Sequence, residues 1–396
     1  MSAPRVLMVI QRFRPTFTGH GLQIEALSRE LTGRGAEIEI LTRHIEGTVR
    51  CEEGPVPVRR FPMTPGRNPL QVWWSHREVL RYIHGAARRF NILHIHGAPP
   101  GLPFLIGAAH EAGLRTVITT TLLGSDDPVS LRTRGRLARW RFRAYRTADR
   151  FIAISPALMD TFTTAGIGLE RVRLIPVGVP VDRFHLASDP EREAETLGWN
   201  LGVPRALFVG AVLHRKGVDV LLQAWEQVLG ILPDAHLFVA GPMDFSQQRE
   251  PHLAAFVESC RTRIEEPPLR GHVHFLGPRG DIDALLRASH VFLFPSRMEG
   301  FGNVLSEALA SGTPPVTARI PRCTDHIVRD GETGFVVEQE DAVALAARAV
   351  ELLRDPALRR RFALAGRADV ERQFAFPVIR EAHLELYREL LGHGES

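Results

Sequence analysis

Short apolar segments alternate with longer amphipathic ones along almost the whole chain, and this alternation limits the possible fold more than any other feature. Several short segments are rich in β-branched residues and are bounded by glycine, proline or polar residues, as buried strands are. Strand–helix alternation predicts parallel sheets covered by helices on both faces. In the first half, strands are expected at 5–10, 38–42, 92–96, 116–120, 151–154 and 172–175, and helices at 22–34, 70–89 and 131–148.

A segment with several prolines and glycines, 176–204, interrupts the alternation and is expected to connect two domains, with room for a short helix in it. The pattern then resumes, and a length of 396 residues suits two domains. We therefore predict an α/β protein with two doubly wound parallel-sheet domains, 1–180 and 181–376, and a cleft between them. In the second half, strands are expected at 207–210, 237–240, 273–276, 291–294, 315–317 and 335–337, and helices at 218–231, 304–310 and onward to the C-terminus.

Composition restricts the compartment and the kinds of site. The three cysteines, Cys51, Cys260 and Cys323, form no C-x-x-C pair, which argues against a disulfide framework or a structural zinc site and favours a reducing compartment. The apolar run 6–10 is too short for a signal peptide, and no segment approaches the roughly 20 apolar residues that span a bilayer. We expect a cytoplasmic protein, and peripheral contact with the inner face of the membrane stays open.

The strongest candidate for a ligand site is a glycine-rich turn after the expected strand 291–294. Glu299 lies in the turn, and Glu307 lies about one turn into the helix that follows. Glycines let the backbone approach a ligand, and the N–H groups at a helix start favour a phosphate or a sugar hydroxyl. Carboxylates suit hydroxyl-rich ligands because each accepts two hydrogen bonds. A helix cap with two solvated acids is the alternative. The residues between the acids and the helix are Gly300, Phe301, Gly302 and Asn303.

A second turn, after the strand that ends near Gly210, carries the adjacent cations Arg215 and Lys216. Arginine can hold a diphosphate through two parallel hydrogen bonds, and lysine adds a point charge. If a diphosphate departs during the reaction, fixed cations stabilise the transition state more than the ground state. Two solvated surface cations are the alternative, which the neighbouring acidic turn makes less attractive.

Together the two turns resemble the retaining glycosyltransferases of the GT-B fold, family 4, also called glycosyl transferases group 1. The acidic and Arg-Lys motifs are fairly specific, whereas the other similar segments are weak when taken singly. Those segments cover nearly the whole chain: a glycine loop and first helix at 6–35, a His-x-His strand at 92–97, mid-chain markers at 148–155, 175–178 and 181–184, and the strand at 288–296.

The resemblance implies a division of labour between the domains. Domain 1–180 would bind the acceptor, domain 181–376 would bind the nucleotide-sugar donor, and the closing segment 377–396 would form a helix that crosses back to the first domain. Such enzymes transfer the sugar with retention of its anomeric configuration, and they usually need no catalytic metal and no cofactor besides the nucleotide-sugar, which is a substrate.

The resemblance also implies a role for each matching residue. Glu307 would bind the ribose hydroxyls, and Glu299 with the amides of 301–303 would hold the donor sugar. Arg215 and Lys216 would bind the diphosphate. The remaining donor contacts would come from Gly19 and Gly21, which close over the phosphates, and from the segment Gly277 to Arg279, near the nucleobase.

One departure from the family pattern concerns the segment after the strand 116–120. Family members often carry a histidine there, in a Thr-x-His-Gly-like context, but this chain reads Thr-Thr-Thr-Leu-Leu-Gly-Ser-Asp-Asp-Pro. Thr121 or Asp126 is expected to occupy that place and to touch the donor sugar or the acceptor. The Asp126–Asp127 pair also suits a helix-entry turn before Pro128.

Two other groups of ionisable residues are better explained by their structural positions than by metal binding. His94 and His96 alternate on a strand, and without a third ligand they do not predict a metal site; partly buried strand-end histidines are the simpler interpretation. His96, nearer the strand end, is the better candidate to face the cleft and the acceptor. Asp281 and Asp283 superficially resemble a metal-binding pair, but capping of the next helix explains them better.

The segment 131–150 holds eight arginines against a single acid, Asp149, interleaved with Trp140, Phe142 and Tyr145. A basic helix with aromatic residues can lie on an anionic membrane surface or bind a diphosphate-lipid acceptor. An ordinary charged helix is the alternative. Nucleic acid is disfavoured as a partner, because no nucleic-acid-binding motif accompanies the charge.

These features favour a retaining glycosyltransferase that moves a sugar from a UDP- or GDP-linked donor to a hydroxyl of a saccharide or lipid-linked acceptor, in polysaccharide or glycolipid biosynthesis. A catalytically weak relative that acts as a binding or partner subunit is the alternative, motivated by the absent histidine. A sugar-nucleotide epimerase or a nicotinamide dehydrogenase is disfavoured, because no G-x-G-x-x-G follows the first strand and no acid ends the second.

Overall fold

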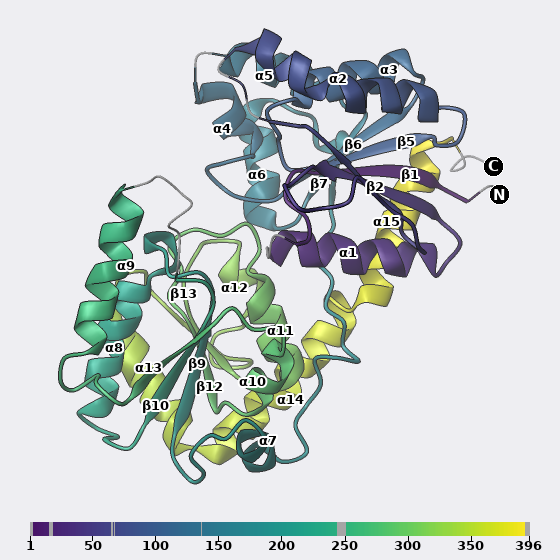
Figure 1. Ribbon diagram of the computed structural model, residues 1–396. Coiled ribbons are helices and arrows are strands. Elements are labelled where there is room, and N and C mark those ends of the chain that lie inside the picture. Colours follow the sequence, from purple (N-terminus) through teal and green to yellow (C-terminus); the bar gives the residue numbers. More distant parts are fainter. Residues whose placement is uncertain are drawn as a thin grey trace. The chain divides into compact units, whose positions relative to one another are not determined.

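The computed structural model describes residues 3–15, 19–64, 66, 68–135, 137–243 and 251–392. The chain divides into two compact units: unit 1 is Met1–Gly178 with Phe376–Ser396, and unit 2 is Val179–Ala375. Each unit is built on its own sheet, with helices packed on the sheet faces (Figure 1). The last helix, α15 (Phe376–Leu390), belongs to unit 1 and packs against α1 (Gly19–Thr32).

Unit 1 contains an eight-stranded sheet with the order β3-β4-β2-β1-β5-β6-β7-β8. Every neighbouring pair is parallel except β3–β4 at one edge. The strand order reverses between β1 and β5, and a doubly wound sheet binds its ligands at the carboxyl edge of such a point. The strands are β1 (Arg5–Ile10), β2 (Glu37–Arg43), β3 (Cys51–Glu52), β4 (Val58–Phe61), β5 (Ile92–His96), β6 (Arg115–Thr120), β7 (Arg150–Ala153) and β8 (Val172–Leu174).

The six strands predicted in this half are confirmed, but the single helix predicted at 131–148 is wrong. Two shorter helices lie there, because Gly135 adopts a left-handed backbone with φ of 85° that no helix interior allows. The strands β3 and β4 and the helices α3 and α6 were not predicted. Besides α1, the helices of unit 1 are α2 (Pro69–Ala86), α3 (Leu102–Glu111), α4 (Pro128–Thr133), α5 (Ala138–Tyr145), α6 (Pro156–Ala165) and the 3₁₀ turn η1 (Leu169–Arg171).

Unit 2 contains a six-stranded, wholly parallel sheet with the order β11-β10-β9-β12-β13-β14. Counted within the unit, this is the order 3-2-1-4-5-6 of dinucleotide-binding sheets, with its reversal between β9 and β12. The strands are β9 (Arg205–Val209), β10 (His236–Ala240), β11 (Val273–Gly277), β12 (Val291–Phe294), β13 (Pro315–Ala318) and β14 (Phe335–Val337).

The helices of unit 2 bury one stripe each against this sheet. In α8, Leu221 and Trp225 are fully buried in the core beside Leu345 of α13, as the spacing of apolar residues at three and four positions predicts. The helices are α7 (Pro190–Thr196), η2 (His214–Lys216, a 3₁₀ turn), α8 (Val218–Leu229), α9 (Pro251–Ile264), α10 (Ile282–Arg287), α11 (Asn303–Ser311), α12 (Thr324–Ile327), α13 (Ala342–Arg354) and α14 (Pro356–Gln373).

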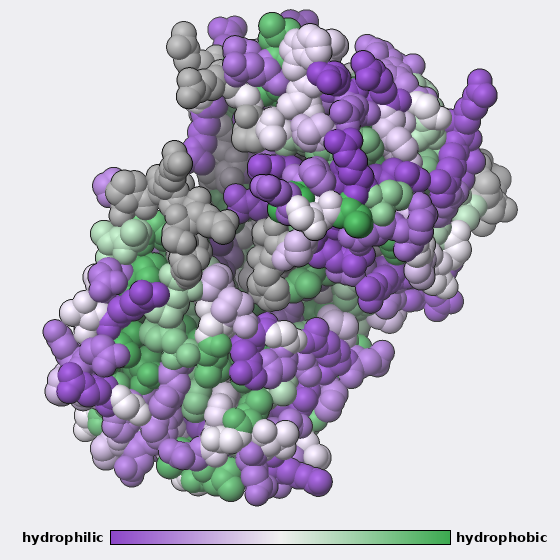
Figure 2. Space-filling view, in the orientation of Figure 1, coloured by the Kyte–Doolittle hydropathy of each residue, from purple (hydrophilic) through white to green (hydrophobic). Residues whose placement is uncertain are grey.

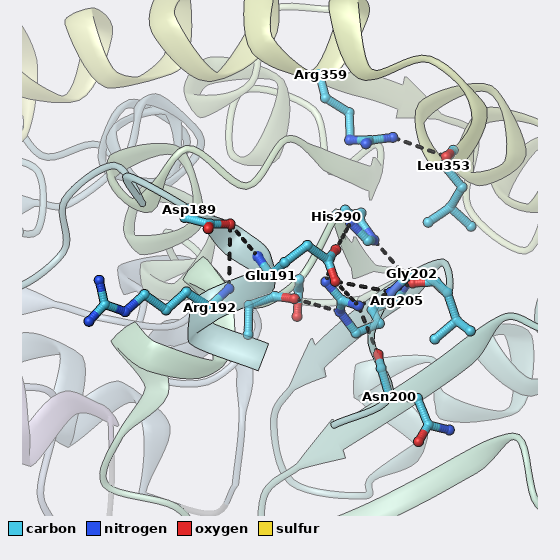
Figure 3. A network of polar contacts seen from close by, with 12 residues as sticks. Asp189, Glu191, Arg192, Asn200, Gly202, Arg205, His290, Leu353 and Arg359 are labelled. Carbon is cyan, nitrogen blue, oxygen red and sulfur yellow. Dashed lines mark hydrogen bonds and ion pairs between the residues drawn. The ribbon is translucent and has the colours of Figure 1, made fainter. Parts of the chain in front are cut away.

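A buried arginine fastens the short helix α7 to the sheet of unit 2 (Figure 3). Arg205 at the start of β9 is wholly buried, and its Nη2 donates to Glu191 Oε1 over 2.6 Å while its Nε donates to the Ala288 carbonyl. Hydrogen bonds from Arg205 hold the pKa of Glu191 down to about 2. Asp189 caps the helix by accepting from the backbone N–H of Glu191. The 176–204 segment therefore contains a helix that is anchored to unit 2.

Four histidines from three elements meet inside unit 1. His94 and His96 of β5 lie near His20 of α1 and His383 of α15, with ring centroids 4.1 Å apart between His94 and His96 and 5.7 Å apart between His20 and His96. His94 is hydrogen-bonded to the Tyr387 hydroxyl and the Thr119 hydroxyl, each over 2.7 Å. Burial lowers the pKa of all four histidines, to about 4 for His20 and His383.

We expect this cluster to make unit 1 sensitive to acid. Because the folded pKa of His383 is about 4 and its ordinary value is near 6.5, protonation favours the unfolded chain. The stabilising contribution of the neutral ring is complete above about pH 6.5 and is lost as pH falls toward 4, up to ~3 kcal/mol for His383. We expect the thermal midpoint, followed by near-UV circular dichroism, to fall steeply between pH 6.5 and 4.5, and His383→Phe to flatten that fall. The exposed His185 gives the control His185→Gln; equal pH profiles for all three proteins would contradict the assignment.

None of the described helices combines the length and the apolarity that a membrane-crossing helix requires.

Candidate functional site

The strand order of unit 2 brings two loops together at the carboxyl edge of its sheet, where the order reverses between β9 and β12. The loop after β9 carries Arg215 and Lys216, and the loop after β12 carries Glu299. The Arg297 amide donates to the Arg215 carbonyl over 2.8 Å, so the two backbones are in contact. A Cβ on Gly217, whose φ is 68°, would lie 2.0 Å from the Pro295 carbonyl oxygen. Only glycine therefore permits this approach.

Lys216 and Glu299, which are 83 positions apart in the sequence, form an ion pair in this crevice. Lys216 Nζ lies 2.5 Å from Glu299 Oε1, and Arg215 Nη1 lies 3.7 Å from the same oxygen. The Glu299 side chain is about 10% exposed and that of Lys216 13%, whereas that of Arg215 is 39% exposed. The ammonium also lies over the Phe294 ring. Lys216 is the only lysine in the sequence, a signal that singles out this position beyond the motif itself.

Arg297, which the sequence reasoning did not single out, holds these two loops in place. Its guanidinium donates to both carboxylate oxygens of Asp219 over 2.8 Å and to Glu340 over 2.5 and 2.7 Å. Burial alone would raise the pKa of Asp219, but the hydrogen bonds and charge of Arg297 outweigh it and lower the pKa. Arg297 is a positioning residue, and the Pro-Ser-Arg sequence directly after β12 is the signal that could have found it.

The acidic turn leads into α11 as the sequence predicts. Gly302 precedes the helix with a φ of 96°, and Asn303 is its first residue. The Phe301 side chain is buried and packs edge-on against Phe374. Glu307 lies one turn further on and is half-buried. Gly300, at the turn, is buried.

Glycines also lie at the carboxyl ends of three neighbouring strands of this sheet. Gly210, Gly241 and Gly277 follow or close β9, β10 and β11, and a Cβ on Gly241 would lie 2.1 Å from the Gly210 carbonyl oxygen. The Gly241 amide donates to the Gly277 carbonyl over 2.8 Å. Gly241 was not among the predicted residues, although a glycine directly after a strand is a visible signal. The backbones of Gly210 and Gly241 are therefore closely packed, whereas a Cβ on Gly277 would meet no atom within 4 Å.

The segment predicted near the nucleobase carries an ion pair. Arg279 Nε donates to Asp281 Oδ1 over 2.8 Å. The expectation that Asp281 caps α10 is wrong: it occupies the N-cap position, but its carboxylate makes no capping hydrogen bond. Asp283 is also held by arginines, namely Arg183 at 2.7 Å and Arg287 at 3.3 Å. The carboxylates pair with guanidinium groups because these are stronger donors than a backbone N–H.

In unit 1, Gly19 and Gly21 lie in the first turn of α1, which follows β1. Gly19 is exposed and Gly21 is buried. These glycines belong to unit 1 and the Lys216–Glu299 pair belongs to unit 2. Their approach to a donor held by unit 2 stays a prediction.

Thr121 and Asp126 form one structure after β6. Asp126 accepts hydrogen bonds from the backbone N–H groups of Thr121 and Leu122, the latter over 2.7 Å, and from the Thr121 hydroxyl over 2.5 Å. Burial raises the pKa of Asp126, against these hydrogen bonds. Gly97, after β5, has a φ of 78°, and a Cβ there would lie 3.1 Å from Asp126 Oδ2. The carboxyl ends of β5 and β6 therefore meet around this carboxylate.

Asp127 and Arg141 complete this edge of unit 1. Asp127 caps α4 by accepting from the Ser130 N–H over 2.9 Å, which confirms the predicted helix-entry turn for this residue. Arg141 reaches back from α5 and donates to the Ala98 carbonyl over 3.0 Å. It is half-buried, and burial lowers its pKa. Arg141 was predicted only as one member of a basic segment, because its distance from Ala98 along the chain hides the contact.

His96 is buried rather than partly exposed, since only 4% of it is accessible. It lines a small pocket of about 40 Å³ together with His20 and Phe376. Neither of its ring nitrogens has a hydrogen-bond partner among the described residues. The hydrogen bonds of His94 explain why a polar side chain is buried at that position. The burial of His96 at the end of β5 has no such explanation.

Within the described ranges, no group of three or more His, Cys, Asp or Glu side chains is arranged to hold a metal ion.

Comparisons with known proteins identify the family of this chain. The family model described as "Glycosyl transferases group 1" matches residues 189–369, and "Glycosyltransferase Family 4" matches residues 17–183. The chain is 30% identical over 329 residues to a phosphatidyl-myo-inositol mannosyltransferase of Mycobacterium leprae, with 79% of each protein covered.

Solved structures show the same fold at lower identity. A sucrose-phosphate synthase from Thermosynechococcus elongatus superposes with a TM-score of 0.81 at 22% identity, over 98% of this chain and 99% of that one. The Anabaena protein HepE, solved in complex with UDP and glucose, gives 0.79 at 20% identity, over 98% and 100%. The predicted GT-B fold, with two Rossmann-like parallel-sheet domains, is confirmed. Because family models match both halves and a relative matches over 79% of each protein, the chain belongs to the glycosyl transferases of group 1 and is a glycosyltransferase.

Proposed function

We propose that this glycosyltransferase moves a hexosyl group from a UDP- or GDP-linked sugar to a hydroxyl of a saccharide or lipid-linked acceptor, with retention and without a catalytic metal. The Lys216–Glu299 contact at the strand-order reversal of unit 2 carries the proposal, because it places a cation and a carboxylate where a doubly wound sheet binds nucleotides. The crystal structure of the Anabaena relative with UDP and glucose supports a uridine donor, and the mannosyltransferase relative supports a phosphorylated lipid acceptor.

Each donor group has a matching partner in unit 2. Lys216 and the more exposed Arg215 bind the diphosphate, and the amides of Phe301, Gly302 and Asn303 at the start of α11 favour the same negative charge. Glu307, one turn into α11, accepts from the ribose hydroxyls. Glu299, oriented by Lys216, accepts from the hydroxyls of the donor sugar. The bare backbone of Gly277 and the neighbouring Arg279 border the nucleobase.

In the reaction, the bond between the anomeric carbon and the diphosphate oxygen breaks, and its electron pair stays with the diphosphate. The acceptor oxygen bonds to the anomeric carbon on the same face, and its proton passes to the departing phosphate oxygen. Lys216 and Arg215 stabilise the charge that grows on the leaving group. Gly19 and Gly21 close over the phosphates from unit 1.

Unit 1 supplies the acceptor groups in this proposal. Asp126, held by Thr121, offers a carboxylate of raised pKa at the carboxyl end of β6. Arg141 offers a half-buried guanidinium with no carboxylate partner among the described residues, which suits an acceptor that carries a phosphate. His96 lies at the end of the neighbouring strand.

A calorimetric panel of UDP, GDP, ADP and their sugars tests the donor site. We expect micromolar binding of one base, and a loss of about 10- to 100-fold for Glu307→Ala and for Arg215→Ala/Lys216→Ala, as the removal of charged hydrogen bonds predicts. The exposed Arg192 gives the matched control Arg192→Ala, which should bind like wild type. If nothing binds and all variants behave alike, the binding-subunit alternative replaces this proposal.

Turnover measured in the presence of EDTA tests the independence from metal. Turnover that is unchanged by EDTA supports the proposal, whereas turnover that is lost in EDTA and restored by Mg²⁺ contradicts it.

A further inference from the structure

The exposed tryptophans of the chain gather on one helical layer of unit 1. Of the five tryptophans, Trp73, Trp74 and Trp140 are 41%, 53% and 37% exposed, and all three belong to α2 or α5. Leu70 of α2 and Leu137 beside α5 are exposed as well, at 64% and 39%. Trp199 and Trp225 of unit 2 are half-buried and fully buried. The exposed tryptophans are thus confined to α2 and α5, whereas other exposed apolar side chains, such as Leu201 and Val343, are distributed over the chain.

These helices lie side by side on one face of the first sheet (Figure 1). Contacts join α2 to α3 and α3 to α5, and the Phe104 ring of α3 packs edge-on against Trp140 of α5 at 5.5 Å. A groove of about 330 Å³ between α2 and α3 is lined by Trp73, Arg77 and Arg81. The surface of unit 1 is mostly hydrophilic in the space-filling view, with apolar residues interspersed (Figure 2).

The same layer carries several arginines that form no ion pair with the described residues. A pocket of about 770 Å³ beside Trp140 is lined by guanidinium groups of α4, α5 and η1. Arg77 and Arg81 of α2 add to this charge. Most of these arginines have no ion-pair partner among the described residues, namely Arg77, Arg81, Arg132, Arg139, Arg143 and Arg146; Arg171 of the pocket is bonded to backbone carbonyls. Elsewhere in unit 1, arginines such as Arg59 and Arg115 are paired with acids.

We propose that α2, α3 and α5 form a docking face for the surface of an anionic phospholipid bilayer. The arginine-lined pocket receives lipid phosphates, and Trp73, Trp74 and Trp140 enter the boundary between headgroups and acyl chains, where tryptophan is favoured. The docking face needs no donor nucleotide, so it stands independently of the donor chemistry proposed above.

The combination favours a bilayer over other polyanions. A soluble phosphorylated ligand would fill the arginine pocket but would not account for the exposed tryptophans and Leu70 of α2. Nucleic acid would stack bases on exposed aromatic rings, but the Trp74 face is covered by Arg77 at 5.0 Å and the Trp140 ring is contacted by Phe104. A membrane uses both features at once, because headgroups are anionic and the boundary beneath them is apolar.

Co-sedimentation of the full chain with sucrose-loaded vesicles tests the proposal. We expect binding to vesicles of phosphatidylcholine with 30 mol% phosphatidylglycerol, weak binding to pure phosphatidylcholine, and release in 0.5 M NaCl, where charge interactions are screened. Arg143→Glu/Arg146→Glu should weaken binding by about 25-fold or more, at about fivefold for each positive charge removed. Trp73→Ala/Trp74→Ala should weaken binding several-fold and leave the salt dependence unchanged.

The matched control is Arg360→Glu/Arg361→Glu, which makes the same change of charge at exposed arginines of α14 in unit 2. It should bind vesicles like wild type, and nucleotide calorimetry should show that every variant keeps the donor site. If both arginine-pair variants lost vesicle binding equally, the net charge of the protein would explain the effect, and the proposal would be overturned. Competition by millimolar inorganic phosphate would assign the pocket to a soluble anion, and tighter binding to duplex DNA than to vesicles would assign the face to nucleic acid; either result overturns it.

Discussion

Lys216→Arg should lower kcat/KM by about two to three orders of magnitude, almost as much as Lys216→Met, although it keeps the positive charge. Lys216 is the only lysine of a chain that otherwise relies on arginine for its permanent cations, so an ammonium is retained where guanidinium is the rule. Its Nζ lies between Glu299 and the Phe294 ring, and its side chain is only 13% exposed. A planar guanidinium is larger and cannot occupy this space as a compact point charge. Steady-state kinetics with the donor identified by calorimetry give the measurement.

The Glu299 partner makes it possible to separate two roles of Lys216. If Lys216 only neutralises and positions Glu299, the double variant Lys216→Met/Glu299→Gln should be no slower than Glu299→Gln alone. If it also stabilises the leaving diphosphate, the double variant should lose a further factor of ten or more, and a double-mutant cycle reports the coupling. Full activity in Lys216→Arg would show that a positive charge alone suffices at this position. The presence of a single lysine in the chain would then carry no mechanistic meaning.

The sequence predicted the strands well because buried parallel strands are continuous apolar runs, which can be recognised without tertiary information. It failed where a local feature decides the structure. Gly135 separates α4 from α5 within the predicted helix 131–148. The sequence shows a glycine inside a helical pattern, but it does not show whether the φ of that glycine is positive. The strands β3 and β4 are short and carry charged residues, and they are held by their neighbours, since β4 pairs with β2 and β3 pairs with β4.

The candidate site was predictable as two motifs but not as a geometry. Glycine-rich turns after strands indicate ligand contact from local sequence alone, and both turns lie where the sheet order reverses. The direct contact between Lys216 and Glu299 arises from the adjacency of β9 and β12, which are far apart in sequence. Arg297 bonds Asp219 and Glu340, and Arg141 bonds the Ala98 carbonyl, so these contacts also join residues that are far apart in sequence. Long arginine side chains form contacts that no spacing rule predicts.

Gly217→Ala should be the most damaging single methyl group that can be added to the donor site. The new Cβ would lie 2.0 Å from the Pro295 carbonyl oxygen, and the φ of 68° is unfavourable for alanine. Backbone strain and overlap together predict a loss of about 3–5 kcal/mol of stability in unit 2. The two loops must separate to relieve the overlap, so the Lys216–Glu299 contact should break. We expect the thermal midpoint to fall by roughly 10 °C, at 2–4 °C for each kcal/mol, and nucleotide binding to be lost.

Gly198→Ala isolates the part of this effect that comes from the crevice. Gly198 has a φ of 70° in the turn after α7, and a Cβ there would meet no atom within 4 Å. Alanine at this position incurs the same left-handed strain, of about 1–2 kcal/mol, without the overlap. The difference between the two variants therefore measures how closely the loops after β9 and β12 approach each other. If both variants lost the same stability and both kept nucleotide binding, the loops would be able to part without consequence, and the close approach at Pro295 would not define the donor site.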